Sequence, residues 1–273
     1  MNAPTTTLTV DAPVLLRERE KDVAILVLNR PEACNSLSEA VLSSLSSALT
    51  EIAADKTVRA VVIAANGPAF CAGHDLKELT SRRSDADGGR EYFQRMMTMC
   101  SGMMQQIINV PQPVIAAVQG VATAAGCQLV ASCDLAVGST TAKFATPGVD
   151  IGLFCSTPMV ALSRNVARKH AMEMLLTGEA VSAEDAYRIG LINRVVNPGE
   201  EREKALDFAR QIAGKSSNIV KIGKEGFYRQ AEMNLAEAYR YVSEVMVENL
   251  MTRDAKEGLN AFIDKREPKW EDR

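Results

Sequence analysis

The feature that most constrains the fold is a recurring succession of a short apolar run, a loop of small residues and a helix start. Runs made mostly of Val, Ile and Ala occupy residues 59–65 and 114–118. Continuous apolar runs of this length are typical of strands that are covered on both faces, and each is followed by a segment with apolar residues at helical spacing. The order strand, strand, helix, repeated with variation, predicts an α/β domain.

The pattern changes along the chain in three parts. Residues 1–12 are polar and Thr-rich, and we expect a disordered tail there. Residues 13–198 contain all the predicted strands, whereas residues 199–273 have apolar residues every three to four positions and no convincing strand. The apolar stripes of such a helical segment must pack on its own core or on other subunits, and we favour other subunits.

Charge and composition exclude several classes of protein. The chain has 31 Lys and Arg against 34 Asp and Glu, a net charge of -3, which gives no support to nucleic-acid binding. Its apolar stretches are shorter than the roughly 20 residues of a membrane span. Six scattered cysteines without a CxxC pair, and only two histidines, favour reduced thiols and no metal site. The N-terminus has neither the charged region nor the apolar region of a signal peptide, so we predict a cytoplasmic location.

The segment FCAGHDLKEL, residues 70–79, is the first candidate for a binding site. It follows a buried strand and opens a helix that Asp75 can cap. A small-residue loop that enters a helix leaves backbone N–H groups unpaired, and these can point at an anion. The alternative is an ordinary strand-to-helix connection in which Gly73 supplies a positive φ angle.

A second segment, residues 119–129, repeats this arrangement with the sequence QGVATAAGCQL. Its loop side chains are small, so a ligand could approach the backbone closely. Two such helix starts facing one pocket would supply two N–H donors to one oxygen, which is an oxyanion hole. Such a site would suit an acyl thioester whose carbonyl becomes an enolate. Motifs for dinucleotides, for a P-loop and for a serine nucleophile elbow do not occur in the sequence.

Five segments together resemble the crotonase, or enoyl-CoA hydratase-isomerase, superfamily of lyases and isomerases of fatty acid metabolism, over about residues 14 to 268. They are NRPEACNSLS, FCAGHDLKEL, QGVATAAGCQLVASCDLAV, LLTGEAVSAEDAYRIGLINRVV and EGLNAFIDKR. The resemblance implies a spiral of ββα units, followed by a C-terminal helical region that builds trimers, often stacked into hexamers. It also implies an acyl-CoA or enoyl-CoA thioester as the ligand, with coenzyme A as part of the substrate and no separate tightly bound cofactor.

The resemblance assigns roles to individual positions. It implies that the backbone N–H groups of His74 and Ala125 form the oxyanion hole. Phe262 and Lys265 match a pair of residues that reaches the coenzyme of a neighbouring subunit in relatives, and a lysine suits a phosphate as a mobile point charge. Other positions fall where the family contacts coenzyme A, largely through backbone: Ala33, Cys34, Ala72, Asp75 and Leu76.

The sequence departs from the family at both catalytic glutamates. Gln128 stands at one glutamate-equivalent position and Gly148 at the other. The Gln amide can form hydrogen bonds but cannot exchange a proton near neutral pH, and Gly has no side chain. Because a positioned acid or base is worth about 10²–10⁴-fold in rate, we expect hydration to be very slow. Asp150 could substitute if its segment is extended, since alternate side chains then share a face, although a turn-capping role is the favoured alternative.

Three functional hypotheses follow. The first is an enzyme that binds an acyl-CoA thioester and stabilises an enolate, as a hydratase-like lyase or isomerase with little or no hydratase activity. The second is a non-catalytic acyl-CoA binder or assembly subunit, which the missing glutamates favour. The third is an interaction module built on the helical tail. Whether side chains at 155–157 reach the acyl group is left open.

Overall fold

A computed structural model describes residues 12–272. Residues 1–11, most of the predicted disordered tail, lie outside the described residues. Its larger sheet has six strands in the order β1-β2-β3-β5-β7-β10. The β1–β2 pair is antiparallel, and the other neighbours are parallel. The strands are β1 (Leu15–Glu20), β2 (Val23–Leu28), β3 (Ala60–Ala65), β5 (Val114–Val118), β7 (Leu135–Ser139) and β10 (Arg194–Val196).

A second sheet of short strands runs in the order β4-β6-β8-β9. Each of β3, β5 and β7 is followed by one of these short strands, and a helix comes next, so the chain winds as the predicted spiral of ββα units. The sequence patterns missed this sheet because strands of two or three residues carry no measurable periodicity. Its strands are β4 (Ala69–Cys71), β6 (Val121–Thr123), β8 (Lys143–Ala145) and β9 (Val181–Ser182).

Both faces of the larger sheet are covered, which explains the continuous apolar runs. Along β2, alternate residues point into two separate cores: Leu26 contributes to one core and Ile25 to the other. Helices α1 (Glu39–Ala54), α3 (Arg90–Asn109) and α4 (Ala125–Ser132) supply the first core. Helix α8 (Glu201–Ala213) covers the opposite face of the sheet through the second core. The α/β class predicted from the sequence is therefore confirmed.

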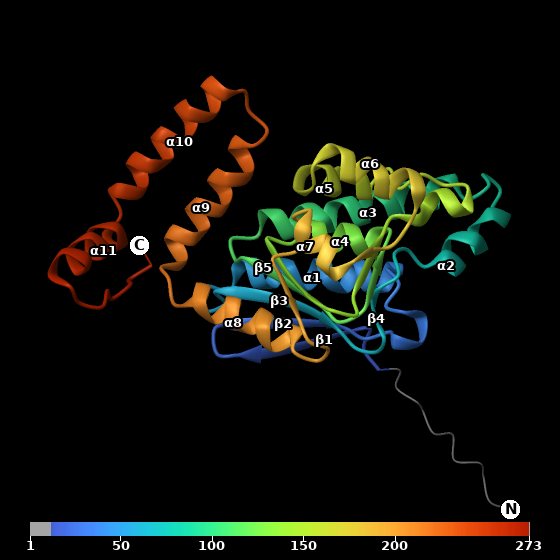
Figure 1. Ribbon diagram of the computed structural model, residues 1–273, viewed down its shortest axis with the longest axis horizontal. Coiled ribbons are helices and arrows are strands. Elements are labelled where there is room, and N and C mark those ends of the chain that lie inside the picture. The colour runs from blue at the N-terminus through green and yellow to red at the C-terminus, as the bar shows by residue number, and fades with distance from the viewer. Residues whose placement is uncertain (1–11, 273) are drawn as a thin grey trace, which may run out of the picture.

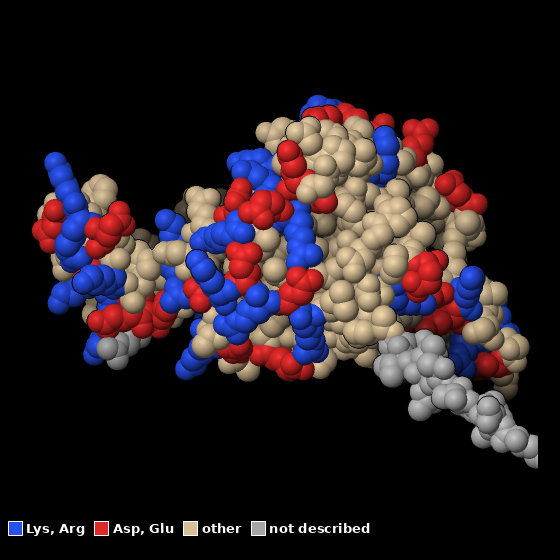
Figure 2. Space-filling view, turned by 90° about the horizontal axis from the view of Figure 1, so that it is seen from below, with Lys and Arg blue, Asp and Glu red and all other residues tan. Residues whose placement is uncertain are grey.

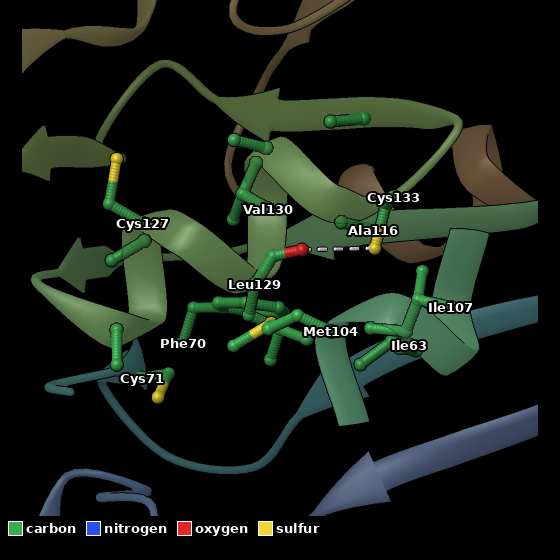
Figure 3. Close-up of a cluster of buried hydrophobic side chains, with 14 of the residues drawn as sticks. Ile63, Phe70, Cys71, Met104, Ile107, Ala116, Cys127, Leu129, Val130 and Cys133 are labelled. Atoms are coloured by element: carbon green, nitrogen blue, oxygen red, sulfur yellow. Dashed lines mark hydrogen bonds between the residues drawn. The ribbon is translucent and has the colours of Figure 1, made fainter. Parts of the chain in front are cut away.

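Helix α4 is the most enclosed element of the core, since all eight of its residues are buried. Figure 3 shows Leu129 of α4 beside Phe70, Met104 and Ile107, with Cys133 donating to the Leu129 carbonyl at 3.3 Å. A close-packed interior resists small shifts, because even a single added methylene is felt. The start of α4 is thus held firmly against β4 and α3.

The remaining short helices connect these units. They are the α-helices α2 (Leu76–Ser81), α5 (Pro158–Asn165), α6 (Arg168–Thr177) and α7 (Ala183–Arg188), and the 3-10 helices η1 (Pro31–Ala33), η2 (Arg82–Ser84) and η3 (Pro147–Ile151).

The last three helices form an arm that extends from the α/β body (Figure 1). They are α9 (Ser217–Gln230), α10 (Leu235–Leu250) and α11 (Arg253–Asp264). Lys224 fixes the base of the arm, since its Nζ donates to the carbonyls of Ile107 and Gln112 and pairs with Asp134 at 2.7 Å. Tyr228 donates to the other Asp134 oxygen at 2.9 Å. Burial lowers the pKa of Lys224, and the charge of Asp134 opposes that shift.

Exposed apolar side chains gather along this arm. Phe262 is 85% exposed and Met251 is 79% exposed. Further exposed members are Phe227, Leu235, Tyr239, Met246, Val247, Leu250, Leu259 and Ile263. An apolar surface of this extent usually marks an interaction site.

Charged residues are mixed in sign over the underside of the body. Figure 2 shows Lys and Arg interspersed with Asp and Glu over one part of this face, beside a broad area of uncharged residues. Arg210 of α8 pairs with Glu20 of β1 at 2.8 Å and with Glu203 at 2.6 Å. Within residues 12–272, no helix combines the length and the hydropathy that crossing a membrane would require.

Candidate functional site

The two loops predicted to carry a site lie against each other. Gly73, at φ +89°, faces the start of α4, where a Cβ would lie 3.3 Å from the Ala125 nitrogen and 3.0 Å from the Ala124 Cβ. A Cβ on Gly126 would lie 2.0 Å from the Cys71 carbonyl oxygen. Only glycine permits these approaches, so the sequence signal of small residues corresponds to close contact between the two backbones.

The His74 peptide is bracketed by hydrogen bonds on both sides. The Gly73 carbonyl accepts from Leu37 N–H at 2.7 Å, and Asp75 N–H donates to the Leu37 carbonyl at 3.3 Å. These bonds form an isolated parallel bridge between Leu37 and His74. Among the hydrogen bonds of residues 12–272, none uses the His74 N–H as donor.

The Ala125 N–H is likewise uncommitted within the described part of the chain, because Ala125 is the first residue of α4 and has no side-chain cap before it. Ala124 precedes it at φ 50° and ψ −118°, a region that non-glycine residues rarely occupy. Such a conformation costs about 1–3 kcal/mol and persists only where the surroundings impose it. Here the Ala124 N–H is held by the Ala145 carbonyl at 2.9 Å. Two neighbouring free amides can together stabilise negative charge on one oxygen.

The loop after β2 joins this region. The Cys34 carbonyl accepts from Ala72 N–H at 3.0 Å. Cys34 is exposed at φ 49°, Ala72 is exposed and Leu76 is 52% exposed. Asp75 caps α2 by accepting from the N–H groups of Lys77 and Glu78. The structure thus brings the five positions implied for the coenzyme, Ala33, Cys34, Ala72, Asp75 and Leu76, to adjoining loops.

The His74 imidazole is enclosed, and neither ring nitrogen has a hydrogen-bond partner among residues 12–272. Burial lowers the pKa of His74, and the nearby Leu37 backbone offsets part of this shift without making a hydrogen bond of good geometry. The ring is therefore expected to stay neutral near neutral pH.

Gln128 and Thr146 are two further enclosed polar side chains next to these loops. Gln128 is 5% exposed, and its Oε1 has no hydrogen-bond partner in the part of the chain that the structure describes. Its backbone N–H donates to the Ala124 carbonyl at 3.0 Å. Thr146 is fully buried, and its hydroxyl also has no hydrogen-bond partner among the described residues. A buried polar atom without a partner costs about 1–3 kcal/mol, so a ligand or a water molecule is the expected partner.

Gly148 is buried in η3, and a side chain there would be in tight contact with its neighbours. A Cβ there would lie 3.0 Å from the Cys155 sulfur and 3.0 Å from the Leu153 carbonyl oxygen. Cys155 is 6% exposed, and burial raises the pKa of its thiol. The arrangement offers no charged acid or base at either glutamate-equivalent position.

The reason for considering Asp150 as a substitute base is wrong. That inference needed an extended segment, in which Gly148 and Asp150 share a face, but residues 147–151 form the 3-10 helix η3. Asp150 is exposed, and its carboxylate lies beside Gly178, where a Cβ would be 2.9 Å from Oδ2. Gly178 ends α6, so the side chain contacts the surface end of that helix.

Phe262 and Lys265 are not brought to the two loops within one chain. Both lie in or just after α11, at the far end of the arm from α2 (Figure 1). Lys265 is exposed and caps α11 in the left-handed conformation at φ 55°.

Sequence patterns missed the ion pairs that join residues far apart in the chain, one beside the site and one at the base of the arm. Arg30 donates to Asp75, 45 positions later, and Lys224 binds Asp134 across 90 positions. The sequence does show a charged residue next to a buried strand in each pair, but no local pattern specifies which distant residue pairs with it. Within residues 12–272, no three His, Cys, Asp or Glu side chains are grouped so as to hold a metal ion.

The chain belongs to the enoyl-CoA hydratase/isomerase family, whose model matches residues 18–273. It is 48% identical over 259 residues to enoyl-CoA hydratase domain-containing protein 3, mitochondrial, of Rattus norvegicus, covering 94% of this chain and 85% of that protein. It is 35% identical over 260 residues to a probable enoyl-CoA hydratase of Rhizobium meliloti, covering 95% of this chain and 98% of the relative. The family resemblance used in the sequence interpretation is confirmed.

Solved structures agree with this assignment. An enoyl-CoA hydratase from Mycobacterium smegmatis superposes with a TM-score of 0.90 at 50% identity, covering 95% of this chain and 99% of that one. The human enoyl-CoA hydratase domain-containing protein 3 superposes with a TM-score of 0.89 at 47% identity, covering 94% and 100%.

The predicted cytoplasmic location is wrong by this comparison. The rat, human and mouse relatives, which are 47–49% identical to this chain, are all named mitochondrial. The prediction depended on the first residues of the chain, where composition alone did not indicate a mitochondrial protein.

Proposed function

We propose that this protein binds an acyl-CoA or enoyl-CoA thioester and stabilises its enolate through the backbone N–H groups of His74 and Ala125. The observation that carries the proposal is the pair of uncommitted amides held on adjoining loops, beside the strained Ala124. Strain and unpaired donors are costly, so their presence together favours a site whose donors are completed by a ligand. Family membership supports the thioester as that ligand.

Hydration is expected to be slow or absent. Gln128 cannot transfer a proton near neutral pH, and Gly148 has no side chain that could act as an acid or base. Hydratase-like lyase or isomerase chemistry would therefore depend on the oxyanion hole alone. A non-catalytic role as an acyl-CoA binder or assembly subunit is the second candidate, and the same two positions favour it.

Coenzyme A would enter as part of the substrate, with no separate tightly bound cofactor. The adjoining loops that hold Cys34, Ala72 and Leu76 would contact it, largely through backbone. A homotrimer, or a dimer of trimers, would cover the apolar surface of α9 to α11 and allow Phe262 and Lys265 to reach a neighbour's coenzyme. The names of the mitochondrial relatives support a mitochondrial location rather than a cytoplasmic one.

Two measurements on the full-length protein test the proposal. Calorimetric titration with crotonyl-CoA and longer enoyl-CoAs should show binding that an Ala125→Phe variant loses, because Ala125 is 1% exposed and a larger side chain displaces its amide. A coupled hydration assay then separates the two candidates. Turnover above that of Ala125→Phe supports an enzyme, and binding without turnover supports the non-catalytic role. No binding of any CoA ester would refute both and favour an interaction module.

A further inference from the structure

An ion pair between Arg30 and Asp75 links the loop that contains His74 to the loop after β2. Both terminal nitrogens of Arg30 donate to Oδ2 of Asp75, at 3.2 and 3.1 Å, and Ser36 Oγ donates to the same oxygen at 3.2 Å. The Arg30 and Asp75 side chains are 22% and 11% exposed. An arginine holds a carboxylate in this forked manner with fixed geometry, which a lysine cannot reproduce.

The second carboxylate oxygen of Asp75 caps helix α2, which begins two residues after His74. Oδ1 accepts from Lys77 N–H at 3.1 Å and from Glu78 N–H at 3.3 Å, which caps α2. Burial alone would raise the pKa of Asp75, but hydrogen bonds from the Glu78 backbone, Arg30 and Ser36 outweigh it and leave the pKa below its usual value. The carboxylate is thus charged and held on both oxygens, and it belongs to the residue directly after His74.

Arg30 also organises the loop implied to contact the coenzyme. Its backbone N–H donates to Asn35 Oδ1 at 2.8 Å, and its guanidinium donates to the Ser36 carbonyl at 3.1 Å. Cys34 and Asn35 are consecutive residues with positive φ, 49° and 53°, a conformation that needs support from its surroundings. Asn35 itself is anchored by donating to the carbonyls of Asn66 and Ala69, both at 2.8 Å.

We infer that Arg30 is a positioning residue, which through Asp75 fixes the His74 amide relative to the loop at residues 33–37. The inference rests on the proposed function, because it assigns a purpose to the His74 N–H. One arginine then sets both halves of the site: the turn that would hold the coenzyme and the amide that would hold the thioester oxygen. A ligand engaged at the coenzyme end would meet an oxyanion donor already in place.

The test uses cinnamoyl-CoA, a conjugated thioester whose ultraviolet band moves to longer wavelength when donors polarise its carbonyl. The variants are Arg30→Met, which removes the charge and both hydrogen bonds to Asp75, and Arg30→Lys, which keeps the charge but not the paired guanidinium donors. Arg19→Met is the matched control, since Arg19 of the edge strand β1 forms an arginine–aspartate pair with Asp55 at the same 3.1 Å, away from the two loops. The shift of the absorption band is recorded at saturating cinnamoyl-CoA and at a temperature well below each variant's unfolding midpoint. The spectrum then reports only ligand bound to folded protein.

We expect Arg30→Met to lose most of the red shift and to bind about tenfold more weakly, the factor that one ordinary hydrogen bond corresponds to. Arg30→Lys should recover part of the affinity but less of the shift, and Arg19→Met should match the wild type. A full red shift in both Arg30 variants overturns the inference, even if their midpoints fall, because a merely structural role would alter stability and leave the bound spectrum unchanged. If the wild type itself binds without a red shift, the proposed oxyanion hole fails, and the role of Arg30 fails with it.

Discussion

Replacing Gly126 by alanine tests whether the close contact of the two loops creates the site. The added Cβ would lie 2.0 Å from the Cys71 carbonyl oxygen, 2.7 Å from its carbon and 2.9 Å from its Cβ. Real Cβ atoms essentially never approach another heavy atom within 3.0 Å, so α4 and the chain after β4 must separate by about 1 Å. His74 follows Cys71 by three residues, and Ala125 directly precedes Gly126, so this separation changes the spacing of the two amides.

Two effects of different size should result. Overpacking of this kind costs about 1–3 kcal/mol, which lowers the unfolding midpoint of a chain this long by several degrees. A donor that moves by about 1 Å from an ideal distance of about 2.9 Å no longer makes a hydrogen bond. Loss of one oxyanion donor reduces turnover by about 10²–10³-fold where an enzyme depends on it, and removes much of the carbonyl polarisation of a bound thioester. The function should therefore suffer more than the fold.

The assay combines thermal unfolding, followed by circular dichroism, with the absorption of bound cinnamoyl-CoA. Gly102→Ala is the matched control, because Gly102 lies within α3 and its Cβ would meet nothing within 4 Å. Alanine there should stabilise the helix by about 0.5–1 kcal/mol and leave the ligand spectrum unchanged. If Gly126→Ala behaved like this control in both measurements, the argument that glycine is needed for the approach of the two loops would be refuted.

Three further results are expected. Lys224→Met should lower the free energy of unfolding by about 3–5 kcal/mol, measured by chemical unfolding, because the Asp134 carboxylate then loses its buried cation. A loss below about 1 kcal/mol would contradict the role given to this ion pair. Thiol labelling at about pH 8 should modify Cys34 alone in the native protein, because the five other cysteines are buried. Burial raises the pKa of three of these, Cys71, Cys100 and Cys127, to about 12, so their thiols stay protonated. Reaction of a second thiol before unfolding would show that the core opens. Gly148→Glu should fail to increase hydration of crotonyl-CoA and should lower stability. Combining it with Cys155→Ala should recover part of that stability. Equal stability of the single and double variants would mean that the Cys155 thiol does not hinder a side chain at position 148.

Much of the fold could be predicted because it depends on neighbours within a few positions. The apolar runs at residues 59–65 and 114–118 identified β3 and β5, and small residues before a helix start identified both loops of the site. Each of these signals is local, since residues on one helix turn or one strand face report the same environment. The family resemblance rested on the same local motifs, which is why it named His74 and Ala125 while leaving their geometry open.

The tertiary structure alone decided which distant residues meet. The pairing of Arg30 with Asp75, and of Lys224 with Asp134, leaves no periodic trace in the chain, because hydrogen bonding across 45 or 90 positions depends on how whole elements pack. Asp150 illustrates the same limit: its position two residues after Gly148 suggested a shared face, but the packing of η3 against α6 imposed a turn instead. Amino-acid order therefore determined the elements and the small-residue loops of this protein. The three-dimensional packing, which minimises buried unpaired charge and steric overlap over the whole molecule, determined how those loops form one site.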